Sequence, residues 1–340
     1  MKTFKPAVGI WVWSAFIFGG WNATTLWAAS VDVVNDISQT SYTSFLSGTN
    51  TLYAHAGDAK GMDGGTQHDL TRDYIDTTLA SYGLATTLQS FTFTNSGTVY
   101  TGNNVVAVKL GTVNPNQIYV LGAHYDTINN MTGSPDPGSP GADDDASGVA
   151  GLLEAARVMS KYSFQSTIVF TAFDAEEEGL YGSAAYVQAH RTDNIKGMIE
   201  LDMIAYNPTA SGGYNKAFAC GSDASNPIKD ALISAVAAYS SSSTPLSAAR
   251  DGSESSDHYS FEQAGFQATL LFEGDPSNPN YHQLTDSVDT PGYIDYGYAT
   301  AMTRSAVGYL ADSAIVVPEP GTLWLLSLGG FAPLLRRRKR

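Results

Sequence analysis

Carboxylate and imidazole side chains gather in five short stretches of this 340-residue sequence. The stretches are AHYD at 123–126, GADDDASG at 141–148, AEEEG at 175–179, ELDM at 200–203 and NYHQLTD at 280–286. Two imidazoles together with several carboxylates suit zinc or a similar divalent ion. Because Cys220 is the only cysteine, a structural zinc site built from thiolates is disfavoured, and the pattern favours an open catalytic site.

Adjacent carboxylates also have a simpler interpretation, as a solvated face or as the first turn of a helix. The surrounding elements argue against it. Apolar runs predict strands, and stretches with a period near 3.6 predict helices. The expected strands are 84–93, 102–111, 117–126, 166–173, 197–206 and 266–273. The expected helices are 68–82, 146–162, 180–191, 226–239 and 293–314, preceded by a helix and loop within 31–66.

This alternation predicts an α/β fold, a three-layer α/β/α sandwich whose mixed, mostly parallel central sheet carries helices on both faces. In such sheets, ligands bind beyond the carboxyl ends of the strands. His124, Glu176–Glu178 and Asp202 all fall at such ends. Glu200 and Asp202 alternate along one strand, so both are expected on the same face of the sheet. We therefore expect the clusters to converge on one site.

The two ends of the chain read as targeting segments. Residues 1–30 combine Lys2 and Lys5, an apolar stretch and the small residues Ala28-Ala29-Ser30, which is the pattern of a secretory signal peptide. A membrane anchor is the alternative, but the apolar stretch is short for a span. Residues 318–340 contain Pro318-Glu319-Pro320, about fifteen mostly apolar residues and then five basic ones. The catalytic body is expected to be residues 31–317.

The charge of that body limits its partners. Without the two ends, 11 basic residues face 32 acidic ones, a net charge of −21. A surface this acidic is a poor partner for nucleic acid. A single cysteine allows no internal disulfide, so the exported body must rely on its core and on bound metal.

The C-terminal segment resembles the PEP-CTERM sorting tail of Gram-negative bacteria, because its three parts occur in that order. The resemblance implies transient membrane contact, processing by an exosortase-type enzyme, and a protein that is secreted or displayed at the cell surface. An ordinary membrane anchor is the alternative.

The order and spacing of the five stretches resemble peptidase family M28, the bacterial leucyl-type aminopeptidases with two zinc ions, from about residue 69 to residue 310. The resemblance implies a fold of the zinc-dependent exopeptidase type. It implies Glu176 as general base and Asp126 as the residue that orients His124, and a cis peptide bond just after Asp144. The implied ligands of two Zn²⁺, or of another divalent metal, are His124, Asp144, Glu177, Asp202 and His282.

Other residues have open roles. Asp145 is a candidate helix N-cap close to the site, and Asp286 is expected to support His282. Asp257 and His258 either lie behind the site or are purely structural. Met203 lines the specificity pocket or packs in the core. Glu178, His68 and His190 are expected to be solvated, and Cys220 to be a small buried residue. Where relatives of the secreted type carry a disulfide and a tyrosine near the oxyanion, this chain has DGSESSDH, with Ser253 in place of the tyrosine.

The expected activity is removal of N-terminal residues, expected to be apolar, from peptides outside the cell by metal-activated water. Three alternatives remain open: a carboxypeptidase or dipeptidase, a glutaminyl cyclase on the same scaffold, and an inactive surface or matrix protein. A full set of five ligands argues against the last two.

Overall fold

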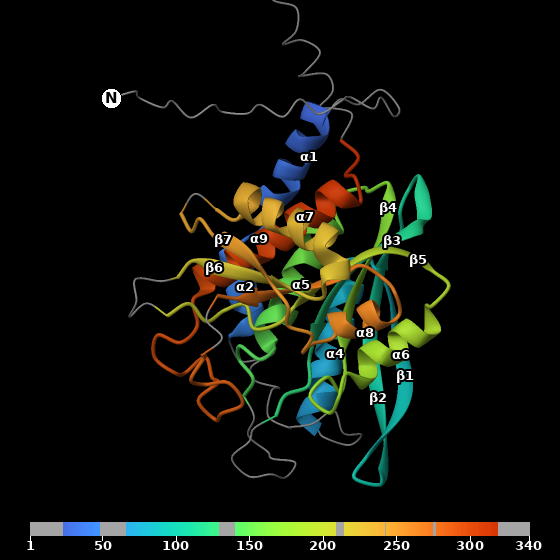
Figure 1. The fold of residues 1–340 in the computed structure, drawn as a ribbon, viewed down its shortest axis with the longest axis vertical. Helices are drawn as coiled ribbons and strands as arrows, with labels where there is room; N and C mark the ends of the chain where they lie inside the picture. Colours follow the sequence, from blue (N-terminus) through green and yellow to red (C-terminus); the bar gives the residue numbers. More distant parts are fainter. Residues whose placement is uncertain are drawn as a thin grey trace, which may run out of the picture.

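The computed structural model describes residues 23–47, 66–128, 140–208, 214–241, 243–274 and 277–318. Eight strands in these residues form one sheet, in the order β1-β2-β4-β3-β5-β8-β6-β7 (Figure 1). They are β1 Ala85–Asn95, β2 Thr98–Lys109, β3 Asn114–His124, β4 Ser166–Phe173, β5 Asn194–Leu201, β6 Lys216–Cys220, β7 Ser247–Asp251 and β8 Ala268–Glu273. The pairs β3–β4, β3–β5, β5–β8 and β6–β7 are parallel, whereas β1–β2, β2–β4 and β6–β8 are antiparallel. The predicted mixed α/β sheet is confirmed.

Helices cover both faces of the sheet, as predicted. They are α1 Ala23–Asn35, α2 Gln39–Leu46, α4 Thr66–Ser81, α5 Ala146–Met159, α6 Tyr181–Ala189, α7 Asn226–Tyr239, α8 His258–Gln263 and α9 Tyr296–Ser313, with a short 3₁₀ turn at Asp223–Ser225. The larger apolar core lies beneath α2, α5, α7 and α9, and a smaller one lies beneath α6 and α8. Strands β6 and β7 and helix α8 were not predicted from the sequence.

Strand parity decides which side chains reach which face. Val120 on β3 and Met198 on β5 belong to the smaller core, whereas Leu121 and Ile199 belong to the larger one. Because side chains alternate, His124, Glu200 and Asp202 lie on the face of the smaller core. Strand β4, STIVFTAF, is buried along its whole length, as expected for a central strand covered on both faces.

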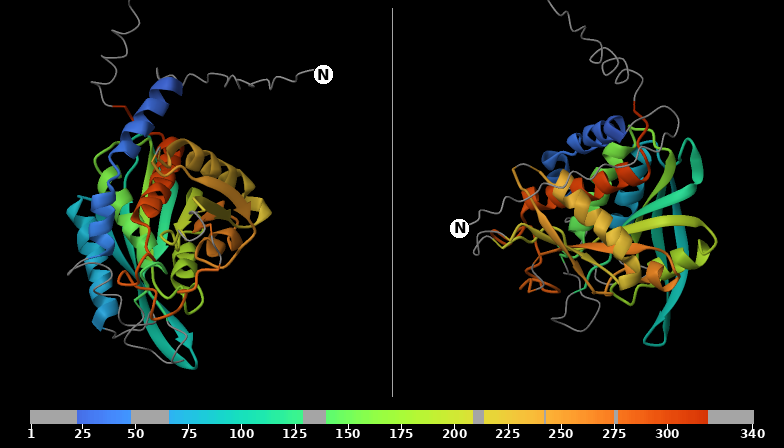
Figure 2. Two further views of the ribbon diagram at one scale, coloured as in Figure 1. Left: turned by 90° about the vertical axis from the view of Figure 1, so that its left-hand side faces the viewer. Right: turned by 45° about the horizontal axis from the view of Figure 1, so that its top comes forward.

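The N-terminal helix α1 packs against α9 and projects beyond the body of the molecule at its N-terminal end (Figures 1 and 2). The expected cleavage site at residues 28–30 lies inside this helix, whereas residues 1–22 of the expected signal peptide lie outside the described residues. Most of the C-terminal tail, from residue 319, also lies outside them. Within the described parts of the chain, no helix has the length and apolar character needed to cross a membrane.

Candidate metal centre and catalytic site

Three strands deliver site residues at their carboxyl ends. His124 is the last residue of β3, Glu176 and Glu177 follow β4 within four residues, and Asp202 directly follows β5. Since β3 pairs in parallel with both β4 and β5, these ends meet at one edge of the sheet. His282 comes from the loop between β8 and α9 and completes the group.

The three consecutive aspartates before α5, Asp143–Asp145, have different contacts. Asp145 caps the helix, because its Oδ1 accepts hydrogen bonds from the N–H groups of Gly148 at 2.9 Å and Met203 at 3.1 Å. Asp143 Oδ1 accepts one from Ala205 N at 2.8 Å. The peptide bond between Asp144 and Asp145 is cis, as the family resemblance implied. Asp144 is the member of the triplet that lines the cavity.

The carboxylate of Asp144 lies between two imidazoles. Its Oδ1 is 3.2 Å from His124 Nε2, and its Oδ2 is 3.1 Å from His282 Nε2. Beside the first imidazole lies Asp202, with 3.7 Å between Oδ1 and Nε2. Beside the second lies Glu177, with 3.1 Å between Oε2 and Nε2. The five expected ligands therefore form two groups that share one carboxylate.

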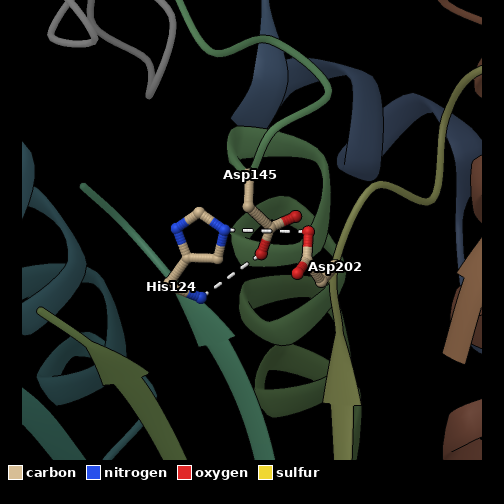
Figure 3. A group of neighbouring side chains, drawn as sticks. All are labelled: His124, Asp145 and Asp202. Carbon is tan, nitrogen blue, oxygen red and sulfur yellow. Dashed lines mark hydrogen bonds and ion pairs between the residues drawn. The ribbon is translucent and has the colours of Figure 1, made fainter. Parts of the chain in front are cut away.

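Asp145 also lies close to the first group of ligands. The potential metal-binding atoms of His124, Asp145 and Asp202 all lie within 4.8 Å of one another (Figure 3). The hydrogen bonds of Asp145 argue for a different role. Its Oδ1 already accepts two main-chain N–H groups, and its Oδ2 faces His124 N at 3.3 Å. Asp145 therefore holds the backbone of the site together, and Asp144 is the better candidate ligand.

Asp126 orients His124 through its main-chain oxygen and not through its carboxylate. The imidazole of His124 donates from Nδ1 to the main-chain oxygen of Asp126 at 3.0 Å, which turns Nε2 into the site, while the Asp126 carboxylate is 3.7 Å away. That carboxylate accepts hydrogen bonds from the N–H groups of Glu176 and Glu177 at 3.0 and 3.1 Å. Asp126 thus also fixes the acidic turn, residues Glu176–Glu178.

The prediction that Asp286 supports His282 is not matched by its contacts. The carboxylate of Asp286 instead accepts hydrogen bonds from Asp143 N at 2.7 Å and Asp144 N at 3.2 Å. Asp286 therefore positions the bridging carboxylate, and the ring of His282 stacks on Tyr281 with 3.7 Å between centroids.

Buried carboxyl groups in the site outnumber the imidazoles beside them, and their pKa values are shifted accordingly. Burial opposes ionisation of Asp144, but His124 and His282 lower its pKa to about 2. Burial, reinforced by Asp144, raises the pKa of Glu177 to about 8. Burial also raises the pKa of Glu176 well above its ordinary range, and Glu177 adds to the shift. No lysine or arginine occurs among the described residues that line the cavity.

The donor set fits metal cations. Glu177 Oε1 and Asp202 Oδ1 are buried and accept no hydrogen bond from the residues described. A buried carboxylate oxygen without a partner is costly, and a divalent cation would remove that cost. Imidazole nitrogens and carboxylate oxygens are the ligands of catalytic zinc sites.

The site opens into a cavity of about 360 Å³. Glu176 and four of the five candidate ligands, all except His282, line it. Met203, whose role was open, lines it too, and so does Ser253, the residue found in place of the family's tyrosine. Other lining residues were not predicted from the sequence. They are Phe218 and Asp251 on the unpredicted strands, and Ser255, Leu270, Phe272, Asn278 and Tyr281. Cys220 is buried as expected but borders the cavity.

Asp257 and His258 lie behind the cavity rather than in it. Both side chains are fully buried, and burial raises the pKa of Asp257 to about 7. His258 Nε2 lies 3.1 Å from the main-chain oxygen of Ser253, which ties α8 to the loop that lines the cavity. Glu200 is also fully buried, on the same face as Asp202.

Two residues expected in solvent have structural contacts instead. His68 is 5% exposed, and its Nε2 pairs with Asp174 Oδ1 at 2.8 Å just before the acidic turn. Glu178 is partly buried and accepts a hydrogen bond from Asn95 on β1. The expectation that they are solvated was wrong because long-range partners are not visible in local sequence.

Comparisons with known proteins agree with this geometry. The family model of peptidase family M28 matches residues 104–309, and that of the PEP-CTERM protein-sorting motif matches residues 316–340. A probable zinc metalloprotease of Pyrenophora tritici-repentis is 42% identical over 110 residues, 32% of this chain and 25% of that protein. Leucine aminopeptidase 1 of Paracoccidioides brasiliensis is 28% identical over 211 residues, 58% of this chain and 53% of that protein. The chain thus spans between a quarter and about half of these relatives.

Solved structures share the fold. BSAP, a zinc aminopeptidase from Bacillus subtilis, superposes with a TM-score of 0.68 at 16% identity, covering 84% of this chain and 96% of that one. Porphyromonas gingivalis glutaminyl cyclase superposes with a TM-score of 0.65 at 21% identity, covering 82% and 99%. The M28 match covers more than half of the 340 residues and includes all five candidate ligands. This chain therefore belongs to peptidase family M28.

Proposed function

We propose that the protein is an exported aminopeptidase that uses two zinc ions to hydrolyse the N-terminal peptide bond of its substrates. The observation that carries the proposal is the position of Asp144, whose two carboxylate oxygens face one imidazole each. A carboxylate shared in this way suits a pair of metal ions. The names of the relatives, zinc metalloprotease and leucine aminopeptidase, support the same activity.

In the proposed site, His124 and Asp202 would hold one ion, His282 and Glu177 would hold the other, and Asp144 would serve both. When bound, the two ions supply Lewis-acid activation of water and of the scissile carbonyl. Glu176 lines the same cavity, and the contact of its main-chain N–H with Asp126 fixes its place beside the ligands. Its carboxylate takes the proton of the attacking water and later delivers it to the leaving amine.

The acidic cavity supports attack at the amino end of a peptide. A free α-amino group is cationic, and the described lining residues include acids but no lysine or arginine. A carboxypeptidase needs a basic group for the substrate's carboxylate, and the lining offers none among the residues described. The two groups of candidate ligands that share Asp144 favour a peptidase over a glutaminyl cyclase, although a cyclase shares the fold.

The tail supports export. The PEP-CTERM match at residues 316–340 suggests processing by an exosortase-type enzyme and delivery to the cell surface. Peptides outside the cell are then the proposed substrates.

Exchange of one glutamate tests the mechanism. We expect Glu176→Gln to lower kcat by about 100-fold to 10,000-fold while bound zinc is unchanged, because the amide cannot accept a proton. Glu178→Gln is the matched control, since Glu178 belongs to the same turn but pairs with Asn95. The assignment of the base fails if Glu176→Gln retains the kcat of the control.

A further inference from the structure

The floor of the cavity beyond the ligands is a small area of sheet. In the register, Cys220 on β6 lies opposite Leu270 on β8 and opposite Asp251 on β7. Directly paired residues point to the same face, so these three side chains form a row. Adjacent strands lie about 4.8 Å apart, which makes the row from Leu270 to Asp251 about 10 Å long.

A second, parallel row connects this floor to the ligands. Phe218 lies opposite Phe272, and both line the cavity. Leu201 is paired with Leu271, so the candidate ligand Asp202 comes next to Phe272. A substrate held at the ligands therefore meets an apolar surface that leads from β5 across β8 and β6, and it ends at a carboxylate on β7.

Asp251 is free to receive a cation. Its Oδ1 accepts one hydrogen bond, from Ser253 N at 2.8 Å, and its side chain forms no ion pair with any residue the structure describes. The neighbouring cations are engaged elsewhere. Arg250 pairs with Asp230, and Lys229 Nζ donates to the main-chain oxygens of Gly221 at 2.6 Å and Asp251 at 3.3 Å.

We infer that Asp251 is a specificity-determining residue that favours substrates whose N-terminal residue is arginine or lysine. This inference rests on the proposed function. The side chains of arginine and lysine reach about 6–7 Å from Cα and combine an aliphatic stem with a cationic head. Because the row is longer than such a side chain, the substrate's Cα atom must lie between Leu270 and Cys220. The stem then packs on Cys220 and Phe218, and the head reaches Asp251, one strand spacing of about 4.8 Å beyond Cys220. Burial and the nearby carboxylates of Asp251 and Asp202 raise the pKa of the Cys220 thiol, which is consistent with the thiol lying between the two.

Other side chains fit this floor less well. Leucine covers the apolar rows but stops short of the carboxylate, and glutamate brings a like charge towards it. Norleucine is the sharpest comparison, because it has an aliphatic stem and an α-amino group but no cationic head. A difference between arginine and norleucine therefore measures the far end of the pocket and not the binding of the α-amino group.

The test combines binding with turnover on the full, zinc-loaded chain. Calorimetry would measure the affinity of L-arginine and L-norleucine for the wild type, Asp251→Asn and Glu254→Gln. Glu254 is an exposed acid three residues away that does not line the cavity, so its variant is the matched control. The p-nitroanilides of the same two amino acids would give kcat/KM.

We expect the wild type and the control to prefer arginine by about fivefold, the upper range for one exposed ion pair, and Asp251→Asn to lose the preference. Equal or weaker binding of arginine in the wild type, or an unchanged preference in Asp251→Asn, overturns the inference. If arginine binds preferentially through Asp251 but neither anilide is hydrolysed, the pocket assignment stands and the proposed aminopeptidase activity fails. If both anilides are hydrolysed equally, the activity stands and the pocket assignment fails.

Discussion

At the scale of single residues, Asp144 owes its position to the bonds of its neighbours. Asp145 is fixed by Gly148 and Met203, and the main-chain N–H of Asp144 is fixed by Asp286. The side chain of Asp144 accepts none of these bonds, so both of its oxygens face the imidazoles. A carboxylate held this way loses little conformational freedom when a metal binds.

We expect Asp144→Asn to weaken both zinc sites together, because one carboxylate serves both groups. Equilibrium dialysis with zinc analysis should give fewer than two ions per chain, at a zinc concentration that saturates the wild type. Asp193→Asn, an acid that pairs with His190 on the surface, should bind zinc like the wild type. Two ions retained by Asp144→Asn would contradict the bridging role.

The sequence could predict which residues meet at the site, because His124, Glu177 and Asp202 each follow the carboxyl end of a predicted strand. No interatomic distance is needed for that prediction. It could not predict which atom makes each contact. Asp126 lies two residues after His124, which suggested a side-chain contact, but the backbone turns so that the carbonyl oxygen is nearer. Asp286 lies four residues after His282 and instead binds a loop more than 140 positions away.

At the scale of elements, the site depends on the fit between the start of α5 and the end of β5. Gly148 lies in the first turn of α5, and a methyl group there would clash with the main-chain oxygen of Leu201 and with the Asp145 carboxylate. The φ angle of Gly148 is not in the left-handed region. Glycine is therefore needed at this position because α5 approaches the end of β5 closely, and not because of its backbone conformation.

Gly148→Ala should lower the free energy of unfolding by about 1–3 kcal/mol, because the packed backbone must shift. Gly252→Ala provides the comparison, as a methyl group at Gly252 meets nothing within 4 Å. Urea denaturation would measure both variants. Equal midpoints for the two would show that α5 and β5 do not pack as closely as described.

The long, periodic elements could be predicted, and the short ones could not. β4 and α5 carry clear apolar patterns, whereas KAFAC in β6 and SAARD in β7 have five residues each and little apolar alternation. These strands form because β6 pairs with β8 and β7 pairs with β6, and local sequence holds no record of that pairing. Missing these two strands also hid Phe218 and Asp251, and with them the far end of the cavity.

At the scale of the whole molecule, the N-terminal segment is part of the core. Tyr42 and Leu46 are fully buried, and the Tyr42 hydroxyl donates to the main-chain oxygen of Ser147 at 3.0 Å. Glu154 accepts a hydrogen bond from Ser38 N at 2.7 Å, and Arg304 donates to the main-chain oxygen of Val34 at 2.8 Å. The first turn of α5, which directly follows Asp143–Asp145, thus packs on α2.

Two truncations test this arrangement. A chain that starts at Val31, after the expected cleavage site, keeps Val33, Val34 and Tyr42 and should unfold near the temperature of the full chain. A chain that starts at Ser47 loses several buried side chains, each worth about 2–5 kcal/mol, which exceeds the stability of a typical domain. It should show no cooperative transition in calorimetry. A cooperative transition near the full chain's temperature would mean that residues 31–46 are dispensable, like a removable propeptide.

Zinc-dependent aminopeptidase activity can be measured directly with one unblocked peptide and its N-acetylated twin. The full chain would be incubated with zinc and each peptide, and the products read by mass spectrometry. We predict stepwise loss of residues from the amino end of the unblocked peptide alone, and no loss when zinc is removed by a chelator. Shortening of both peptides from the carboxyl end would contradict it.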